Sequence, residues 1–349
     1  MSEATASKIP VTVLTGYLGA GKTTLLNRIL SENHGKKYAV IVNEFGEIGI
    51  DNDLIIGADE EVFEMNNGCI CCTVRGDLVR IMDGLMKRKG KFDAIIVETT
   101  GLADPAPVAQ TFFVDEDVQK NARLDAVVTV ADAKWLSDRL KDAPEAKNQI
   151  AFADVIVLNK TDLVTKPELA EVEARIRGIN PYAKLHRTER CSVALADVLD
   201  RGAFDLDRIL DIEPDFLEVD DHDHDHDHDH HHSHDHHHHD HGHGLKHYHD
   251  EDMQSLSLKT DKPLDPNVFM PWLQNLVQVE GGKILRSKGI LAFHDDDDRY
   301  VFQGVHMMLE GNHQRKWKDG EPRESRLVFI GRELPEELIR TGFESCIVS

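Results

Sequence analysis

Residues 11–24 read VTVLTGYLGAGKTT, and this stretch decides the fold of the N-terminal part of the chain. Residues 11–14 are apolar or β-branched, as in a strand that is buried on both faces of a parallel sheet. Residues 25–30, LLNRIL, repeat apolar side chains at helical spacing. Between the strand and the helix stands G-x-x-x-x-G-K-T, a phosphate-binding loop in the context that this pattern requires. A chance glycine-rich turn is the alternative, and we disfavour it because strand, loop and helix are all present.

Phosphate binding explains the residue types in this loop. The glycines let the backbone curl with its N–H groups toward the phosphates, where a Cβ would obstruct it, and the helix N-terminus adds positive potential. Lys22 would reach the β- and γ-phosphate oxygens, and the Thr23 hydroxyl would bind Mg²⁺. The predicted nucleotide-binding residues of the loop are Gly16, Gly19, Ala20, Gly21, Lys22, Thr23 and Thr24.

Further apolar runs at residues 39–42, 94–97, 127–130 and 155–158 each predict another buried strand. Amphipathic stretches lie between them, and residues 78–86 have apolar side chains at helical spacing. Strands that alternate with helices favour an α/β fold. We therefore expect the parallel sheet of a P-loop NTPase with helices on both faces.

Two segments would respond to the terminal phosphate of the nucleotide. Residues 43–51, NEFGEIGID, follow the second strand and are predicted to form a switch loop. Glu98 and Gly101 belong to ETTG, directly after the third strand, where a Walker-B carboxylate and a glycine that senses the γ-phosphate would stand. Glu98 would either hold Mg²⁺ through water or position the attacking water, and both roles stay open. The predicted catalytic residues are Lys22, Glu98 and Gly101.

Residues 159–162, NKTD, follow the strand at 155–158 and predict recognition of guanine. Asp162 would accept hydrogen bonds from N1–H and the exocyclic amine of guanine, whereas adenine would leave the carboxylate unpaired. Asn159 and Lys160 complete the motif, and the stem of Lys160 would lie over the base. Residues 188–194 are a candidate for the rest of the base pocket.

A cluster of cysteines precedes Glu98, in the sequence GCICC at residues 68–72. The alternative is that the three cysteines are buried in a hydrophobic core, where a free thiol packs as a small apolar side chain. We disfavour it, because three thiols within four positions do not look like part of a core strand. Structural zinc usually has four ligands in two separated pairs, and no partner pair stands nearby. A three-sulfur site with an incomplete fourth position favours a soft or borderline ion and allows ligand exchange. Glu47 is a candidate fourth ligand. The predicted metal ligands in the cluster are Cys69, Cys71 and Cys72.

The composition limits the class of protein. The 349 residues include 40 Lys and Arg against 63 Asp and Glu, a formal net charge of −23. Such a surface repels nucleic acids and anionic lipids, so we expect neither as a partner. No apolar run reaches the roughly 18 residues of a membrane span, and residues 1–8 lack a signal core, so we expect a cytoplasmic protein. Cys191 and Cys346 are isolated, and we interpret them as core or surface thiols.

Residues 218–252 contain twelve acids, one base and 16 of the 21 histidines. This composition cannot form a hydrophobic face, so we interpret the segment as a disordered linker and a low-specificity metal reservoir. A solvated acidic segment without a metal function is the alternative. After it we expect strands at residues 255–258, 289–293, 300–302 and 326–330 and a helix over 268–277. The predicted divisions are a P-loop GTPase domain (1–215), the His/Asp-rich linker (216–252) and a small α+β domain (253–349).

The phosphate loop, GCICC, ETTG and NKTD together resemble the CobW family of P-loop GTPases, and the likeness covers nearly the whole chain. The resemblance implies hydrolysis of GTP with Mg²⁺, Zn²⁺ on Cys69, Cys71 and Cys72, and delivery of the metal to a client protein as the nucleotide state changes. The family has Glu where other GTPases have Asp, and Glu98 keeps this feature. The eukaryotic zinc-transfer members carry an N-terminal docking segment that residues 1–10 do not show, so the client stays open.

The leading hypothesis is therefore a cytoplasmic zinc metallochaperone that hydrolyses GTP for a metal-requiring client, with a nucleotide-dependent homodimer as a further expectation. Other members of the family are linked to cobalamin synthesis or nitrile hydratase activation, so an accessory GTPase for cobalt or iron enzymes stays open. A His-rich metal storage protein is a second alternative. A small-molecule kinase is disfavoured, because NKTD suits guanine.

Overall fold

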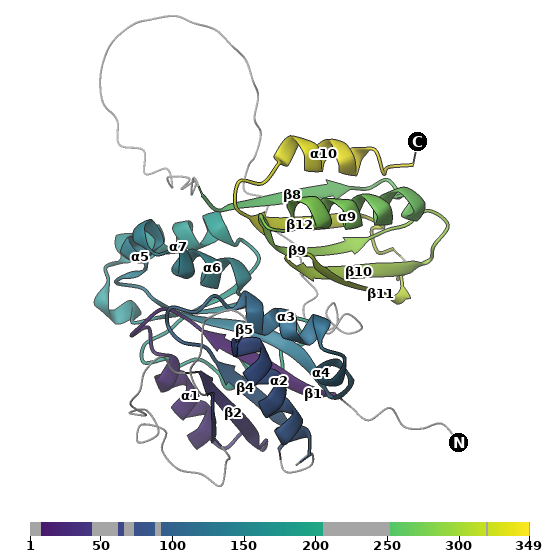
Figure 1. Cartoon of the computed structure of the whole chain (residues 1–349). Coiled ribbons are helices and arrows are strands. Elements are labelled where there is room, and N and C mark those ends of the chain that lie inside the picture. Colours follow the sequence, from purple (N-terminus) through teal and green to yellow (C-terminus); the bar gives the residue numbers. More distant parts are fainter. Residues whose placement is uncertain are drawn as a thin grey trace, which may run out of the picture.

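The computed structural model describes residues 8–43, 62–65, 73–87, 92–204, 252–318 and 320–348. These residues form two units, each built on its own sheet, which lie side by side (Figure 1). The predicted cysteine cluster, most of the predicted switch loop and most of the predicted linker lie outside the described residues. No helix within the described ranges is both long and apolar enough to cross a membrane.

The N-terminal unit contains a sheet of seven strands in the order β3-β2-β4-β1-β5-β6-β7, and every pairing is parallel. All positions of β4 and β6 are buried, which requires a covering layer on both faces of the sheet. The α/β prediction and its five strands are confirmed. The strands are β1 (Ile9–Thr15), β2 (Tyr38–Asn43), β3 (Val62–Met65), β4 (Ala94–Glu98), β5 (Ala122–Asp132), β6 (Val155–Asn159) and β7 (Lys184–Arg187).

The two edge strands, β3 and β7, have no clear signal in the sequence. β7 reads KLHR and no position in it is fully buried, because a strand at the edge of a sheet needs no continuous apolar run. The helices of the unit are α1 (Lys22–Ser31), α2 (Thr73–Met86), α3 (Ala106–Val114), α4 (Glu116–Asn121), α5 (Leu136–Asp142), α6 (Pro144–Phe152) and α7 (Lys166–Ile179), with short 3₁₀ turns η2 (Thr161–Leu163) and η3 (Leu195–Asp197).

The carboxyl ends of the parallel strands meet at one edge of the sheet and place the site there. Leu14 of β1 is paired with Glu98 of β4, and Asp132 of β5 is paired with Asn159 of β6. The segments that follow β1, β4, β5 and β6 therefore open at the same edge. The predicted phosphate, catalytic and guanine-binding residues lie at the ends of β1, β4 and β6 or directly after them.

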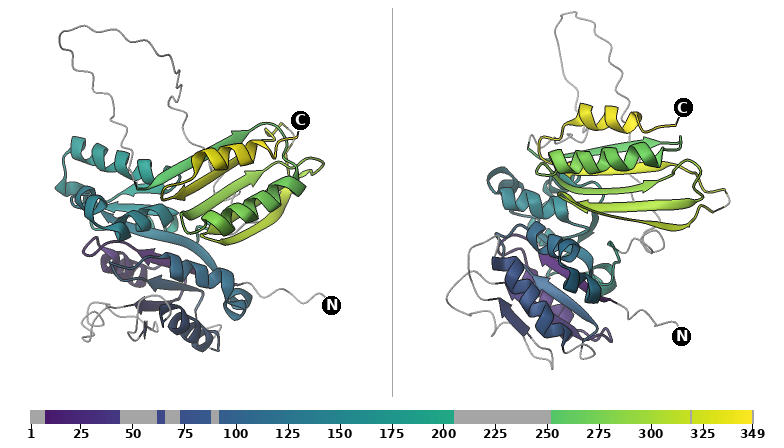
Figure 2. Two further views of the ribbon diagram at one scale, coloured as in Figure 1. Left: turned by 45° about the horizontal axis from the view of Figure 1, so that its top comes forward. Right: turned by 45° about the vertical axis from the view of Figure 1, so that its right-hand side comes forward.

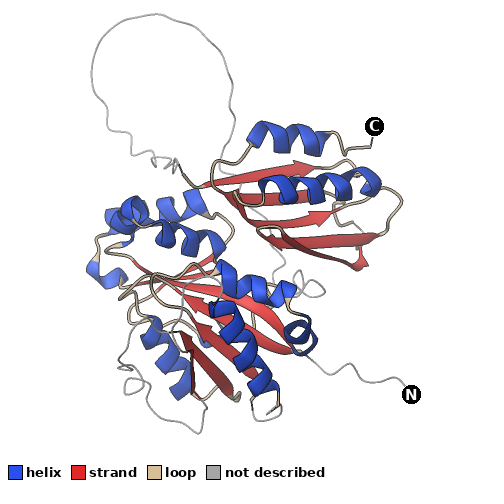
Figure 3. Cartoon of the chain, in the orientation of Figure 1, coloured by secondary structure: helices blue, strands red, loops and turns tan. Residues whose placement is uncertain are grey.

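The C-terminal unit is an antiparallel sheet of five strands in the order β11-β10-β9-β12-β8. Its two helices cover one face (Figure 3), with Phe269, Leu273, Phe302, Phe329 and Ile339 buried between helices and sheet. The predicted helix and strands of this unit are confirmed, whereas the polar strand β11 has no apolar signal. The elements are β8 (Gln254–Thr260), α9 (Pro266–Glu280), β9 (Ile284–Leu291), β10 (Asp298–Val305), β11 (Met308–Lys316), β12 (Ser325–Gly331) and α10 (Glu336–Glu344).

The other face of the antiparallel sheet packs on the N-terminal unit, so the sheet lies between that unit and its own helices (Figure 2). Ile290, Val301, Val305, Val328 and Ile330 belong to the same hydrophobic cluster as the parallel sheet. This shared core makes the contact between the units extensive. Polar side chains also cross it: Arg332 bonds to Asn148, and Arg286 pairs with Asp154.

Candidate nucleotide-binding site

The phosphate loop joins β1 to α1 with three glycines in left-handed backbone conformations. The φ angles of Gly16, Gly19 and Gly21 are 142°, 73° and 119°. A Cβ on Gly16 would lie 2.2 Å from the carbonyl oxygen of Val130, and one on Gly21 would lie 2.6 Å from Nδ2 of Asn159. The loop therefore requires glycine for its conformation and for its close packing. Such a curled, side-chain-free backbone is the cradle that a phosphate chain needs.

Lys22 and Thr23 begin helix α1 directly after this loop. Nζ of the buried Lys22 donates to the carbonyl oxygen of Gly16 at 2.9 Å, so the ammonium group lies against the loop. The first turn of α1 holds no acidic residue, which leaves the positive end of the helix dipole uncompensated. Thr23 is half-buried and Thr24 is exposed. The loop, the ammonium group and the helix end suit a polyanion, and the hydroxyl of Thr23 is the kind of hard oxygen ligand that Mg²⁺ takes.

The segment after β4 packs directly on the phosphate loop. The hydroxyl of Thr99 donates to that of Thr15 at 2.9 Å. A Cβ on Gly101 would lie 2.6 Å from the side chain of Leu18, which belongs to the phosphate loop. Glu98 is buried at the end of β4. The fold thus brings Glu98 and Gly101 to the edge that carries the phosphate loop, which is the arrangement that action on a terminal phosphate requires.

The guanine motif is hydrogen-bonded to the phosphate loop. Nδ2 of Asn159 donates to the carbonyl oxygen of Ala20 at 2.9 Å, and Nζ of Lys160 donates to that of Gly19 at 2.7 Å. Asp162 follows in the turn η2, where it is exposed. The residues predicted to hold phosphate and those predicted to read the base are therefore neighbours, although they stand more than a hundred positions apart in sequence.

Two further residues of this site are not among those predicted from the sequence. Asp132 at the end of β5 forms an ion pair with Lys160, with 2.7 Å between Oδ2 and Nζ. Gln149 of α6 donates from Nε2 to the carbonyl oxygen of Gly101 at 3.2 Å. An acid at the carboxyl end of a buried strand is the signal that identifies Glu98, and it identifies Asp132 equally well. Gln149 lies inside a helix and has no comparable signal.

Residues 188–194, the candidate for the rest of the base pocket, lie beside Asn159. The N–H of Cys191 donates to Oδ1 of Asn159 at 2.8 Å, and Arg28 of α1 donates to the carbonyl oxygens of Cys191 and Val193. Burial raises the pKa of the Cys191 thiol to about 11. Cys191 is fully buried, which agrees with its interpretation as a core thiol.

The predicted metal ligands lie outside the described residues; they are Cys69, Cys71, Cys72 and the candidate Glu47. Their flanks are described: β3 ends at Met65, and α2 begins at Thr73. Met65 at the end of β3 is paired with Asn43 at the end of β2. The residue before Asn43, Val42, is paired with Glu98 at the end of β4. The chain thus leaves β3 at the sheet edge that carries the phosphate loop. Within the described ranges, no three His, Cys, Asp or Glu side chains are placed to hold a metal ion.

Comparison with curated proteins gives relatives along the whole chain. The chain is 34% identical over 340 residues to the zinc chaperone YjiA of Escherichia coli (strain K12), which covers 96% of this chain and 98% of the relative. It is 35% identical over 361 residues to the zinc-regulated GTPase metalloprotein activator 1 of Schizosaccharomyces pombe, which covers 95% of this chain and 84% of the relative. The crystal structure of Zn(II)-bound YjiA GTPase from E. coli superposes with a TM-score of 0.76 at 30% identity, and covers 98% of this chain and 100% of that chain.

Family models match both units of the structure. Residues 10–187 match the CobW/HypB/UreG nucleotide-binding domain, and residues 253–347 match the C-terminal domain of the cobalamin synthesis protein CobW. The first match contains the phosphate loop, Glu98, Gly101 and the guanine motif. By these matches and by its similarity to full-length relatives, this chain belongs to the CobW/HypB/UreG nucleotide-binding family and carries the C-terminal domain of CobW.

Proposed function

We propose that this protein is a cytoplasmic GTPase that binds zinc at Cys69, Cys71 and Cys72 and transfers it to a client protein. The observation that carries the GTPase part is the pair of hydrogen bonds from Asn159 and Lys160 to carbonyl oxygens of the phosphate loop. These bonds fix the base-reading segment relative to the phosphate cradle. The zinc part is supported by relatives named as zinc chaperones and as a zinc-regulated GTPase activator.

In this proposal the chain's own residues act mainly by position and charge, as phosphoryl transfer to water requires. Lys22 neutralises the phosphates, and Asp162 selects guanine. Glu98 positions either the attacking water or the metal, and Gly101 senses the terminal phosphate. Mg²⁺, held by the hydroxyl of Thr23, would neutralise the charge that develops on the phosphate oxygens. We expect slow intrinsic turnover, as in GTPases without an arginine finger in place.

Single-turnover GTP hydrolysis by Lys22→Ala tests the reaction. Because Lys22 supplies a buried positive charge that lies against the loop, we expect the rate to fall by about 100-fold or more. Lys120→Ala is the matched control, since Lys120 forms exposed ion pairs on α4 and its loss should leave hydrolysis unchanged. Hydrolysis by Lys22→Ala at the wild-type rate would overturn the assignment.

Zinc binding is tested by equilibrium competition with a chelator, on wild type and on the variant with Cys69, Cys71 and Cys72 changed to Ser. The proposal expects the tightest site to disappear in this variant and to remain in Cys346→Ala, because Cys346 is buried in the core of the C-terminal unit. Repeating the titration with cobalt(II) and iron(II) decides between zinc delivery and an accessory role for cobalt or iron enzymes. An unchanged zinc isotherm in the triple variant would contradict the proposed site.

A delivery mechanism requires that the nucleotide site and the cysteine site are coupled. The zinc competition titration measures this coupling when it is repeated with different nucleotides. The zinc affinity should differ between the GDP-bound protein and the protein bound to a non-hydrolysable GTP analogue. Equal affinities in the two states would leave a GTPase whose cysteines have no part in the cycle.

A homodimer that forms with GTP is also proposed, with the rim of the phosphate loop as its contact. Leu18, Leu102 and Trp135 are large apolar side chains near this loop and are 60%, 52% and 51% exposed. Such a cluster is typical of a surface that is covered in one state of a protein. Light scattering after size exclusion should give a dimer with the GTP analogue and a monomer with GDP. A monomer in both states would contradict the proposal.

We also propose that the chain divides into the GTPase domain (1–215), the His/Asp-rich linker (216–252) and the C-terminal domain (253–349). The family matches at residues 10–187 and 253–347 support this division. Limited proteolysis should cut first between residues 216 and 252, and first cuts elsewhere would count against it.

A further inference from the structure

Helix α6 lies between the segment after Glu98 and the C-terminal unit, and it contacts both. Gln149 is almost fully buried, and its Nε2 donates to the carbonyl oxygens of Gly101 at 3.2 Å and Ala103 at 3.1 Å. This side chain therefore holds the backbone that follows Glu98 in place. The preceding residue of the helix, Asn148, contacts both this segment and the C-terminal unit.

The amide of Asn148 makes one bond to each unit. Its Nδ2 donates to Oδ2 of Asp104 at 2.9 Å, and its Oδ1 accepts from Nη2 of Arg332 at 2.7 Å. Asp104 belongs to the same segment as Gly101, and its other oxygen accepts from the N–H of Ala106, the first residue of α3, at 2.9 Å. Arg332 follows the last strand of the C-terminal sheet, and its N–H donates to the carbonyl oxygen of Lys283.

Two neighbouring contacts lie along the same path. Helix α3, which begins where this segment ends, packs against β10 and β11 of the C-terminal sheet. Nζ of Lys147, also on α6, lies 2.9 Å from Oδ2 of Asp252, where the described part of the C-terminal unit begins. The segment after Glu98 is thus bonded to α6, and it leads into a helix that packs on the sheet of the other unit.

We propose that Asn148 and Arg332 are positioning residues for GTP hydrolysis, through which the C-terminal unit sets the geometry of the segment that carries Glu98 and Gly101. This inference rests on the proposed GTPase function. Asn148 suits the role because its amide is a donor on one side and an acceptor on the other, so it bridges a carboxylate and a guanidinium that do not bond to each other directly. Neither residue touches the nucleotide in this proposal.

The consequence is a specific split in the kinetics. The hydrogen bonds that join Asp104, Asn148 and Arg332 form a bridge between the units. Loss of this bridge lets the segment after Glu98 shift relative to the phosphate loop, while the phosphate loop and the guanine motif keep the bonds between them. The hydrolytic step then slows while GTP binding is kept. Misplacement of groups that act only in the transition state lowers kcat and leaves KM nearly unchanged.

The experiment measures steady-state GTP hydrolysis by the full-length chain and four variants. Arg332→Ala and Asn148→Asp each break the bridge, the latter because it sets a second carboxylate against Asp104. Asn148→Asp combined with Asp104→Asn restores it, with the donor and acceptor exchanged and the bond from Arg332 kept. Arg340→Ala is the control, because Arg340 forms an exposed ion pair with Glu336 within α10.

We expect kcat to fall about 3- to 10-fold in each single variant of the bridge, with KM for GTP within about two-fold of wild type. The swapped double variant should recover kcat to within about two-fold, which a loss of stability alone cannot explain. Arg340→Ala should match wild type, and thermal unfolding shows that all variants are folded. Wild-type kcat in Arg332→Ala and Asn148→Asp, or no recovery in the double variant, would overturn the inference. If Lys22→Ala also hydrolyses GTP at the wild-type rate, the proposed function fails; if Lys22→Ala is inactive, only the coupling fails.

Discussion

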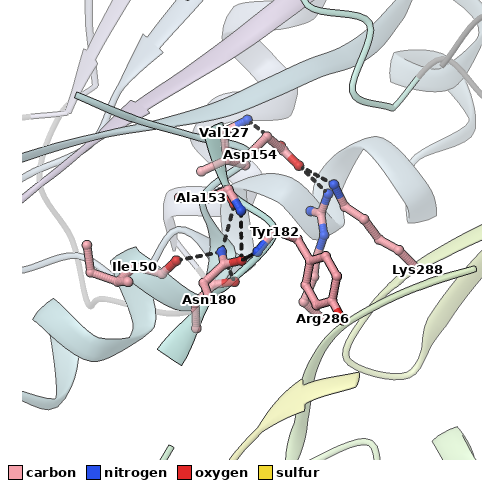
Figure 4. Close-up of polar contacts among 10 residues, drawn as sticks. Val127, Ile150, Ala153, Asp154, Asn180, Tyr182, Arg286 and Lys288 are labelled. Carbon is pink, nitrogen blue, oxygen red and sulfur yellow. Dashed lines mark hydrogen bonds and ion pairs between the residues drawn. The ribbon is translucent and has the colours of Figure 1, made fainter. Parts of the chain in front are cut away.

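Asp154 and Arg286 form an ion pair between the two units, with 2.8 Å between Oδ1 of the acid and Nη2 of the arginine (Figure 4). Both side chains are almost fully buried, at 3% and 2% exposure. Lys288 lies 2.7 Å from the same oxygen, and the N–H of Val127 donates to the other oxygen at 2.8 Å. The guanidinium of Arg286 also lies over the ring of Phe204, 4.0 Å from its centroid. One carboxylate between α6 and β6 thus anchors strand β9 of the C-terminal sheet.

Asp154→Ala should destabilise the protein by about 3–5 kcal/mol, because Arg286 then stays buried without its counter-charge. Urea unfolding at neutral pH measures this loss. The double variant Asp154→Ala with Arg286→Met is the comparison, because it also removes the guanidinium that Asp154→Ala leaves buried without a counter-charge. We expect the double variant to be more stable than Asp154→Ala. A double variant that is less stable than the single one would show that the charge is not the cause.

The same pair predicts a pH dependence. Burial by itself would raise the pKa of Asp154, but Arg286, Lys288 and the N–H of Val127 outweigh it and hold the pKa below its ordinary value of 3.8. Because the pKa is lowered in the folded state, the stabilisation is complete above the unfolded-state value and is lost as the pH falls through the folded-state value. The stability difference between wild type and Asp154→Asn should therefore be constant from neutral pH to about pH 4 and shrink below it. A difference that shrinks between pH 7 and 5 would contradict this assignment.

Gly21→Ala should abolish tight binding of GTP. The residue has a φ of +119°, and a Cβ there would lie 2.6 Å from Nδ2 of Asn159, which bonds the guanine motif to the phosphate loop. We expect the Kd for GTP, measured by isothermal titration calorimetry, to rise about 100-fold. The backbone strain at residue 21 and the loss of the hydrogen bond from Asn159 to Ala20 both contribute. Gly84→Ala is the control with the opposite sign: Gly84 is exposed on α2, nothing lies near its Cβ position, and alanine should raise stability by about 0.5–1 kcal/mol. Normal GTP affinity in Gly21→Ala would remove the structural basis of the site.

Asp162→Asn should change base specificity. An asparagine cannot accept both N–H groups of guanine, so we expect GTP affinity to fall about 100-fold or more. Xanthosine triphosphate has a carbonyl in place of the exocyclic amine, and the asparagine amide can donate to it, so this nucleotide should bind the variant better than GTP. Asp138→Asn on the surface of α5 is the matched control and should keep the preference for GTP. Unchanged GTP affinity in Asp162→Asn would show that Asp162 does not read the base.

Deletion of residues 220–244 distinguishes a zinc-delivering chaperone from a zinc-storage protein. This segment contains most of the histidines of the chain. For a chaperone with a cysteine site, the deletion should leave the tightest zinc site and its affinity unchanged while the number of weak sites falls. Equilibrium dialysis over a range of free zinc concentrations measures both quantities. Loss of the tight site with the segment would favour the storage protein over the chaperone.

The sequence predicts the main features of the N-terminal unit because their causes are local. A buried parallel strand is a short apolar run, and the phosphate loop requires glycine at fixed positions, as the φ angles of Gly16 and Gly21 show. The rule that parallel strands end at one edge then places Glu98 and Asn159 beside the loop. Asp132, at the carboxyl end of β5, obeys the same rule. The polar edge strands β7 and β11 give no such signal, because one side of each strand lacks a neighbour.

The amino-acid sequence by itself determined the nucleotide fold, the phosphate loop and the guanine motif, since each is written in neighbouring residues. Only the tertiary structure decided that α6 joins the segment after Glu98 to the C-terminal unit. Asn148 meets Arg332 across 184 positions, and Asp154 meets Arg286 across 132 positions. The physical reason is that buried charges and amides must find partners, and which partner each one finds depends on how the two sheets pack rather than on any local pattern.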